Sequence, residues 1–146
     1  MQEQVTTPDQ TPSPMVFNLS AHRVDSHGSE VTSKETTLTI DTSMTGRLDA
    51  LNPVELLLAS LAACMIKGIE RVTPSLNFEY TGVNIKLTAV RPALEARIDS
   101  IDYEIMVETN EPDRRLALLH ENVKKFGTIF NTVSAGTKLQ GVLTKI

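Results

Sequence analysis

The fold is decided by residues 52–72, which read Asn52-Pro53-Val54-Glu55-Leu56-Leu57-Leu58-Ala59-Ser60-Leu61-Ala62-Ala63-Cys64-Met65-Ile66-Lys67-Gly68-Ile69-Glu70-Arg71-Val72. From Leu56 to Ile66 the run is apolar apart from Ser60, so a helix here has no face suited to water. We therefore predict a long, buried central helix with the only cysteine of the chain, Cys64, in its middle. The apolar run is shorter than the roughly 20 residues of a membrane span, so no membrane is expected.

The ends of this helix can be predicted from local chemistry. Asn52 is a good N-cap, Pro53 suits the first helical position, and Glu55 stands where the carboxylate of a capping box reaches back. At the other end, Gly68 weakens the last turn and Pro74 is expected to stop the helix after Thr73.

The composition is that of an ordinary globular protein. The chain has 146 residues, 40% of them hydrophobic and 22% charged, with a formal net charge of −4. This charge argues against a nucleic-acid surface. A single cysteine forms no internal disulfide, and the start Met1-Gln2-Glu3-Gln4 lacks the pattern of a signal peptide, so we expect a cytoplasmic protein.

The elements follow one another without regular alternation of strand and helix. Residues 1–14, rich in proline and polar residues, are expected to form a mobile arm, and residues 15–146 a single domain. The patterns predict, in order, a hairpin over 15–33, strand 36–41, the central helix, strands 78–90 and 97–109, helices 113–125 and 128–134, and strand 138–146. This order predicts an α+β fold with largely antiparallel sheet. A helix apolar on all sides also requires cover from a second helix and a second subunit.

The helix motif resembles that of a known family. Asn52-Pro53-x-Glu55-Leu56-Leu57-Leu58-Ala59-x-Leu61-Ala62-Ala63-Cys64, set between a three-stranded N-terminal sheet and two long strands, is similar to the OsmC/Ohr family of osmotically induced and organic-hydroperoxide-resistance proteins. The resemblance covers about residues 15–146 in the order of elements. It implies an intertwined homodimer and a cytoplasmic, thiol-dependent peroxidase that reduces organic hydroperoxides in stress response and detoxification.

We compare the functional residues of that family with this chain one position at a time. Cys64 falls on the peroxidatic cysteine, whereas the position of the second, resolving cysteine is Gly127 here. The activating arginine is best matched by Arg23 and less well by Arg47. The peroxidase branch has its glutamate directly after Asn-Pro, where this chain has Val54, and Glu55 comes one position later.

Each of these residues also has a purely structural interpretation. In this interpretation Cys64 is a small buried hydrophobe, Arg23 a surface arginine, and Glu55 a helix cap. Glu55 and Cys64 are nine positions apart, which places them on nearly opposite faces of an ideal helix. The three histidines have no ligand partners at suitable spacing, so no metal is predicted, and no nucleotide-binding or acyl-transfer motif indicates a cofactor.

Two functions of different classes remain at this point. In the first, Cys64 reduces a small organic hydroperoxide, Arg23 stabilises the thiolate, and an external thiol restores the cysteine. In the second, the protein is a non-catalytic OsmC-like homodimer whose apolar pocket binds a small hydrophobic ligand. The missing second cysteine and the shifted glutamate favour the second function.

Overall fold

The computed structural model describes residues 11–146, which divide into two compact units, 11–50 and Leu51–Ile146. Each unit is described by itself. Most of the expected N-terminal arm lies outside the described residues, and residues 11–14 have no regular structure. The expectation of a single domain over 15–146 stays a prediction.

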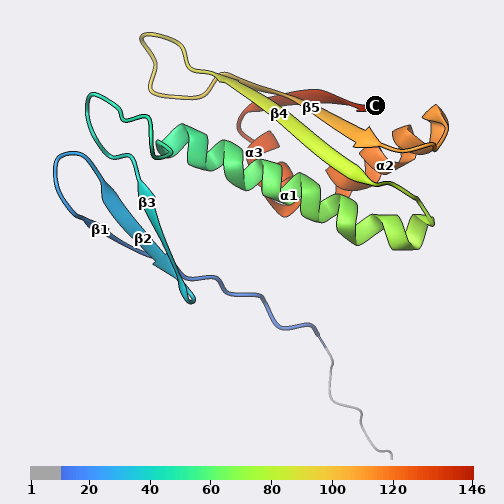
Figure 1. Ribbon diagram of the computed structural model, residues 1–146, viewed down its shortest axis with the longest axis horizontal. Coiled ribbons are helices and arrows are strands. Elements are labelled where there is room, and N and C mark those ends of the chain that lie inside the picture. The colour runs from blue at the N-terminus through green and yellow to red at the C-terminus, as the bar shows by residue number, and fades with distance from the viewer. Residues whose placement is uncertain (1–10) are drawn as a thin grey trace, which may run out of the picture. The chain divides into compact units, whose positions relative to one another are not determined.

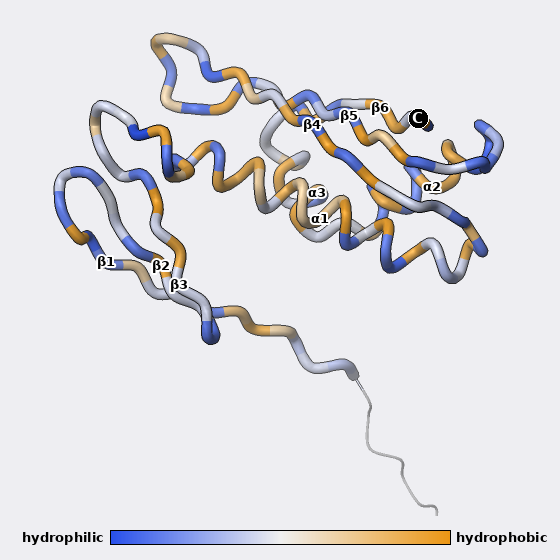
Figure 2. The backbone as a smooth tube through the Cα atoms, viewed as in Figure 1, coloured by the Kyte–Doolittle hydropathy of each residue, from blue (hydrophilic) through white to orange (hydrophobic). Residues whose placement is uncertain are grey.

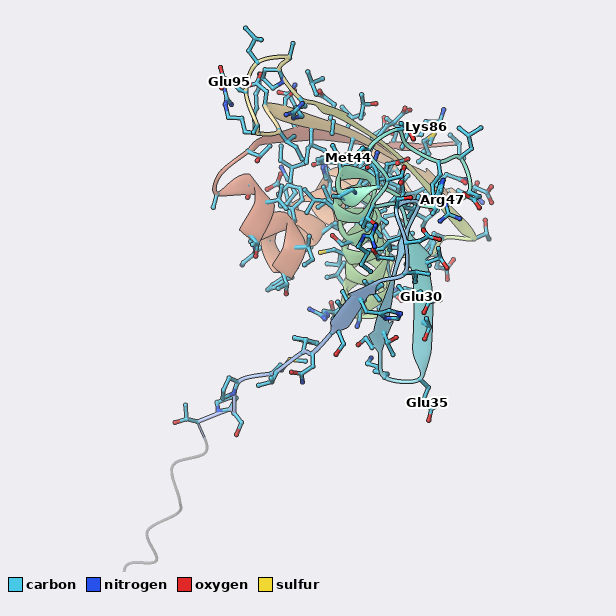
Figure 3. The ribbon with its side chains drawn as sticks, turned by 90° about the vertical axis from the view of Figure 1, so that its left-hand side faces the viewer. Glu30, Glu35, Met44, Arg47, Lys86 and Glu95 are labelled. Atoms are coloured by element: carbon cyan, nitrogen blue, oxygen red, sulfur yellow. The ribbon has the colours of Figure 1, made fainter. Side chains whose placement is uncertain are left out.

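The first unit is a three-stranded antiparallel sheet in the order β1-β2-β3 (Figure 1). Its strands are β1 (Ser20–Arg23), β2 (Ser29–Ser33) and β3 (Thr36–Ile40). The hairpin was expected from Met15, but the first strand begins only at Ser20. Lys34 adopts a positive φ of 56° in the turn between β2 and β3, and Glu35 projects from the tip of that hairpin (Figure 3).

The second unit packs three helices on one face of a second sheet, β4-β5-β6 (Figure 1). Strands β4 and β5 are antiparallel, whereas β6 runs parallel to β5. The four buried side chains of β5 alternate along the strand, as expected for a sheet covered on one face: Ile101, Tyr103, Ile105 and Val107. The elements are α1 (Pro53–Leu76), β4 (Gly82–Val90), β5 (Ser100–Glu108), α2 (Asp113–Phe126), α3 (Thr128–Ser134) and β6 (Lys138–Lys145).

The predicted start of α1 is confirmed in detail. Asn52 Oδ1 accepts the Glu55 backbone N–H at 2.9 Å, and the Glu55 carboxylate accepts the Asn52 N–H at 3.1 Å. Asn52 is thus the N-cap of a complete capping box, with Pro53 in the first turn.

The predicted end of α1 was wrong by about one turn. The helix continues through Pro74 to Leu76 and ends at Asn77, which is left-handed with φ 49° and ψ 48°. Proline removes only one backbone hydrogen bond, and Val72 and Thr73 just before it are buried, so packing outweighs this loss. The Phe78 N–H closes the end by donating to the Thr73 carbonyl at 3.0 Å.

One side of α1 forms the centre of the core in this unit. Its buried side chains pack with those of β5 and with the buried stripe of α2; from α1 and α2 these are Leu61, Met65, Ile69, Val72, Leu116, Leu119 and Val123. Figure 2 shows apolar residues along much of α1. Ala59, Ala63 and Ile66 are nevertheless exposed, so the cover expected on every side is not complete within the chain.

The N-cap provides the first test. We expect Asn52→Ala to lower the free energy of unfolding by about 1 kcal/mol, because the Glu55 N–H loses its acceptor. Urea denaturation measures the change, and Asn110→Ala, in an exposed loop, is the control. Equal stability of the two variants would contradict a stabilising capping box.

Candidate functional site around Cys64

Cys64 lies in the middle of α1 and its side chain is partly exposed. Its helix neighbours Leu61 and Met65 are almost completely buried, at 0% and 1% exposure. One turn before it, the Ser60 hydroxyl donates to the Leu57 carbonyl at 2.7 Å, and one turn after it Gly68 has no side chain. Cys64 thus lies at the edge of the core.

The junction between α2 and α3 lies next to this sulfur. A Cβ atom placed on Gly127 would lie 3.3 Å from Cys64 Sγ, 2.9 Å from Phe130 Cβ and 3.0 Å from the Val123 carbonyl oxygen. Gly127 has φ −79° and ψ 108°, which any residue can adopt. Glycine is therefore needed here for space and not for its backbone freedom.

Tyr103 and His120 form a partly buried pair close to this junction. The Tyr103 hydroxyl of β5 is hydrogen-bonded to His120 Nε2 of α2 at 2.6 Å. The two rings are perpendicular, with centroids 5.7 Å apart, and the Tyr103 ring meets the Phe130 ring of α3 in the same manner at 5.9 Å. Tyr103 therefore contacts both helices that flank Gly127.

The protonation states of this pair follow from its surroundings. Burial, with a smaller contribution from the charge of Glu121, raises the pKa of Tyr103 to about 12. Burial also lowers the pKa of His120, and the nearby Lys124 adds to this effect while Glu121 opposes it. Both rings are therefore neutral at pH 7.

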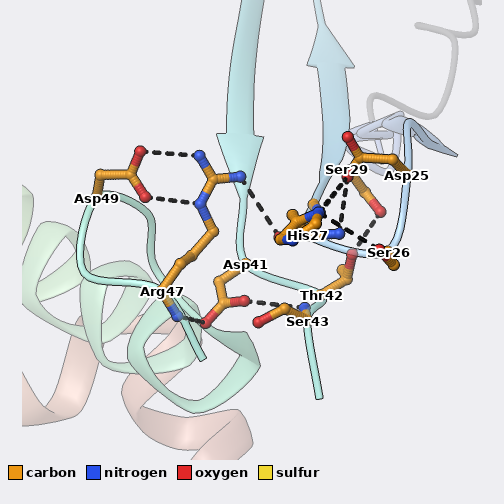
Figure 4. A network of polar contacts seen from close by, with 10 residues as sticks. Asp25, Ser26, His27, Ser29, Asp41, Thr42, Ser43, Arg47 and Asp49 are labelled. Carbon is orange, nitrogen blue, oxygen red and sulfur yellow. Dashed lines mark hydrogen bonds and ion pairs between the residues drawn. The ribbon is translucent and has the colours of Figure 1, made fainter. Parts of the chain in front are cut away.

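Arg47, one of the two candidate arginines, is engaged in a polar network of its own unit (Figure 4). Its Nε and one terminal nitrogen donate to the two carboxylate oxygens of Asp49 at 2.6 and 2.8 Å. Its backbone N–H donates to the Asp41 carboxylate at 3.1 Å. The Arg47 hydrogen bonds lower the pKa of Asp49 to about 2. The network orders the loop after β3.

Arg23 and Glu55 are placed differently from Arg47. Arg23 ends β1 and is exposed, and among residues 11–146 its guanidinium makes no hydrogen bond or ion pair. Glu55 is held in the capping box, about 13 Å along the helix axis from Cys64. The unit that holds Cys64 thus keeps Glu55 apart from it, and both candidate arginines belong to the other unit. Their catalytic roles stay predictions.

Sequence reasoning missed part of this site. Gly127 was assigned only as the place of a missing cysteine, and its contact with Cys64 appears in no local pattern. In the sequence, Tyr103 is one apolar position of the predicted strand 97–109 and His120 one polar position of the predicted helix 113–125, and neither pattern indicates that the two meet. The described residues hold no group of three or more histidine, cysteine or acidic side chains arranged for a metal ion.

The comparisons with known proteins agree on one family. The family model described as OsmC-like protein matches residues 44–140, more than half of the chain. No curated protein matches the sequence. The chain belongs to the OsmC-like family.

Solved structures share this fold at low sequence identity. An OsmC-like protein from Mycoplasma pneumoniae superposes with a TM-score of 0.85 at 15% identity, over 92% of this chain and 99% of that one. An organic hydroperoxide resistance protein OsmC from Legionella pneumophila gives 0.69 at 16% identity, over 92% and 100%. The organic hydroperoxide resistance protein OhrB of Bacillus subtilis gives 0.62 at 18%, over 88% and 98%. No helix in residues 11–146 is long and apolar enough to cross a membrane.

The contact between Gly127 and Cys64 can be tested by cross-linking. In a disulfide each Sγ lies about 3 Å from the partner's Cβ, close to the 3.3 Å found here. We expect Gly127→Cys to form a bond with Cys64 under mild oxidation, seen as the loss of both free thiols in a thiol assay. The control is Gly136→Cys, because a Cβ at Gly136 has no neighbour within 4 Å. Two persistent thiols in the natively folded Gly127→Cys protein would contradict the geometry.

The neutral state of His120 predicts an acid-sensitive stability. Because its pKa is lowered in the folded state, the unfolded chain takes up the proton first as the pH falls below about 6.5. The contribution of neutral His120 to the free energy of unfolding is therefore fully present above this pH. It is lost below this pH, with a slope of at most about 1.4 kcal/mol per pH unit for one proton.

We expect urea denaturation between pH 7 and 5 to show a shallower loss for His120→Gln, whose amide can still bond to Tyr103. The wild-type protein measured over the same range is the reference. Parallel pH profiles for the two proteins would rule out His120 as the source of the loss.

Proposed function

We propose that this protein is a thiol-dependent peroxide reductase of the one-cysteine type, acting on small organic hydroperoxides. The observation that carries the proposal is Cys64, which is partly exposed in the family's helix motif and borders the buried residues Leu61 and Met65. Structural relatives named as organic hydroperoxide resistance proteins support a role in peroxide detoxification.

The reaction needs one oxidation and two thiol exchanges. The Cys64 sulfur attacks the outer oxygen of the hydroperoxide, an S–O bond forms as the O–O bond breaks, and the alcohol leaves with the thiol proton. Because the chain has one cysteine, an external thiol must convert the sulfenic acid to a mixed disulfide with release of water. A second external thiol then frees Cys64. Such thiols are abundant in reducing compartments, so we place the protein in the cytoplasm.

Of the two arginines, Arg23 is the better candidate to stabilise the thiolate. Its guanidinium has no ion-pair partner among residues 11–146, whereas Arg47 is held by Asp49 through two hydrogen bonds. A cation beside a thiolate favours its formation and its attack on the peroxide. For Glu55 the capping role has direct contacts, and Glu55→Gln, which can still cap, would separate that role from a catalytic one.

We also propose that the protein acts as a homodimer. The side of α1 that carries Ala59, Ala63 and Ile66 is apolar and exposed. Small side chains on a helix allow another surface to approach closely, and burial of this side would remove apolar area from water. A second copy of the chain, packed on this side of α1, would give the helix the cover that its sequence predicts.

The test of the function is the rate at which Cys64 is oxidised. We expect cumene hydroperoxide to form the sulfenic acid at least about tenfold faster than hydrogen peroxide does, and faster than with free cysteine. Stopped-flow assays with mass spectrometry measure this, and turnover should require an added thiol. Cys64→Ser should abolish consumption, whereas Gly136→Ala, in open space, should retain it.

A wild-type rate no better than that of free cysteine would overturn the proposal. The alternative is then a non-catalytic homodimer that binds a small hydrophobic ligand. The engagement of Glu55 in the helix cap and the single cysteine favour that alternative.

A further inference from the structure

The junction between α2 and α3 lies next to Cys64, but few contacts of its own fix its position. Helix α3 has seven residues and no side-chain cap at its start. A helix this short is not stable alone, so tertiary contacts must position it. Its only buried residue is Phe130, whose Cβ is also the nearest atom to a Cβ built on Gly127. The residues that pack around the Phe130 ring therefore determine where the junction lies.

Tyr103 packs against the Phe130 ring. Its ring meets the Phe130 ring edge to face, with centroids 5.9 Å apart and planes at 79°. Such pairs contribute about 0.5–1.5 kcal/mol beyond the apolar area that they bury. Tyr103 is itself 5% exposed and lies at the middle of β5, the central strand of the sheet.

The Tyr103 ring is fixed from two further directions. On β6 the residue opposite it is Gly141, and a Cβ there would clash with the Tyr103 carbonyl oxygen and would lie 2.5 Å from two atoms of its ring. The backbone and ring of Tyr103 thus occupy the space that a side chain at position 141 would need. On α2, His120 holds the hydroxyl at 2.6 Å. Tyr103 therefore links the sheet to both helices.

These contacts connect the sheet to the sulfur in a continuous series. The series runs from His120 to Tyr103, then to Phe130, Gly127 and Cys64. We propose that Tyr103 is a positioning residue for Cys64, acting through Phe130 and the Gly127 backbone. This inference rests on the proposed function, because it assigns the residue that places the α2–α3 junction next to the reacting sulfur.

The experiment compares Tyr103 variants with a matched variant of the same strand. Tyr103→Leu removes the ring contact with Phe130, whereas Tyr103→Phe keeps the ring and removes only the hydroxyl. Val107→Ala is the control, because Val107 is buried on the same face of β5, about 13 Å from Tyr103 along the strand. Urea denaturation establishes that all variants are compared well below their unfolding transitions.

Two rates are measured for each folded variant. We expect Tyr103→Leu to slow sulfenic acid formation by cumene hydroperoxide about tenfold and to raise the alkylation of Cys64 by iodoacetamide about fivefold, because the junction moves off the sulfur. Tyr103→Phe and Val107→Ala should stay within about twofold of the wild type. If Tyr103→Leu does not fold, Phe130→Leu tests the same link.

The alkylation rate separates this inference from the proposed function. If the wild-type Cys64 reacts with peroxide no faster than free cysteine, the proposed function fails, and alkylation still decides the role of Tyr103. Equal alkylation rates in Tyr103→Leu and Val107→Ala would overturn the inference. So would a Tyr103→Phe variant that behaves like Tyr103→Leu, because the ring contact would then not be the link.

Discussion

The apolar side of α1 is the surface on which the rest of residues 51–146 is packed. Two helices and a sheet are needed to cover it, and the closest approaches occur where side chains are smallest. A Cβ on Gly68 would lie 3.6 Å from the Val123 side chain, and one on Gly127 would lie 3.3 Å from Cys64 Sγ. Because protein interiors are close-packed, a side chain at position 127 would force its neighbours apart, whereas a Cβ at position 68 would fit at an ordinary contact distance.

This packing also decides the environment of the only thiol. A cysteine buried completely in the core would be an inert hydrophobe, and one on a free helix face would have no defined surroundings. Cys64 has an intermediate burial: it borders core residues of its own helix, and Gly127 lies next to its sulfur. Cys64 therefore has defined neighbours and is still partly exposed.

The thiol and the two candidate arginines belong to different units of the chain. The thiol belongs to residues 51–146, whereas both candidate arginines belong to residues 11–50. Within the first unit, Arg47 is neutralised by Asp49, and Arg23 has no such partner among the described residues. The two arginines are therefore not equivalent, although the sequence alone ranked them only by their position relative to the motif.

Features that depend on residues close together in the chain could be predicted from the sequence. The capping box of Asn52 and Glu55, the buried stripe of α2 and the bounds of α3 all follow from residues within a few positions of each other. Only the tertiary structure decided that α1 continues through Pro74, that β6 is parallel to β5, and that Gly127 lies against Cys64. These features depend on packing between segments far apart in the chain, and such contacts leave no periodic signal in either segment.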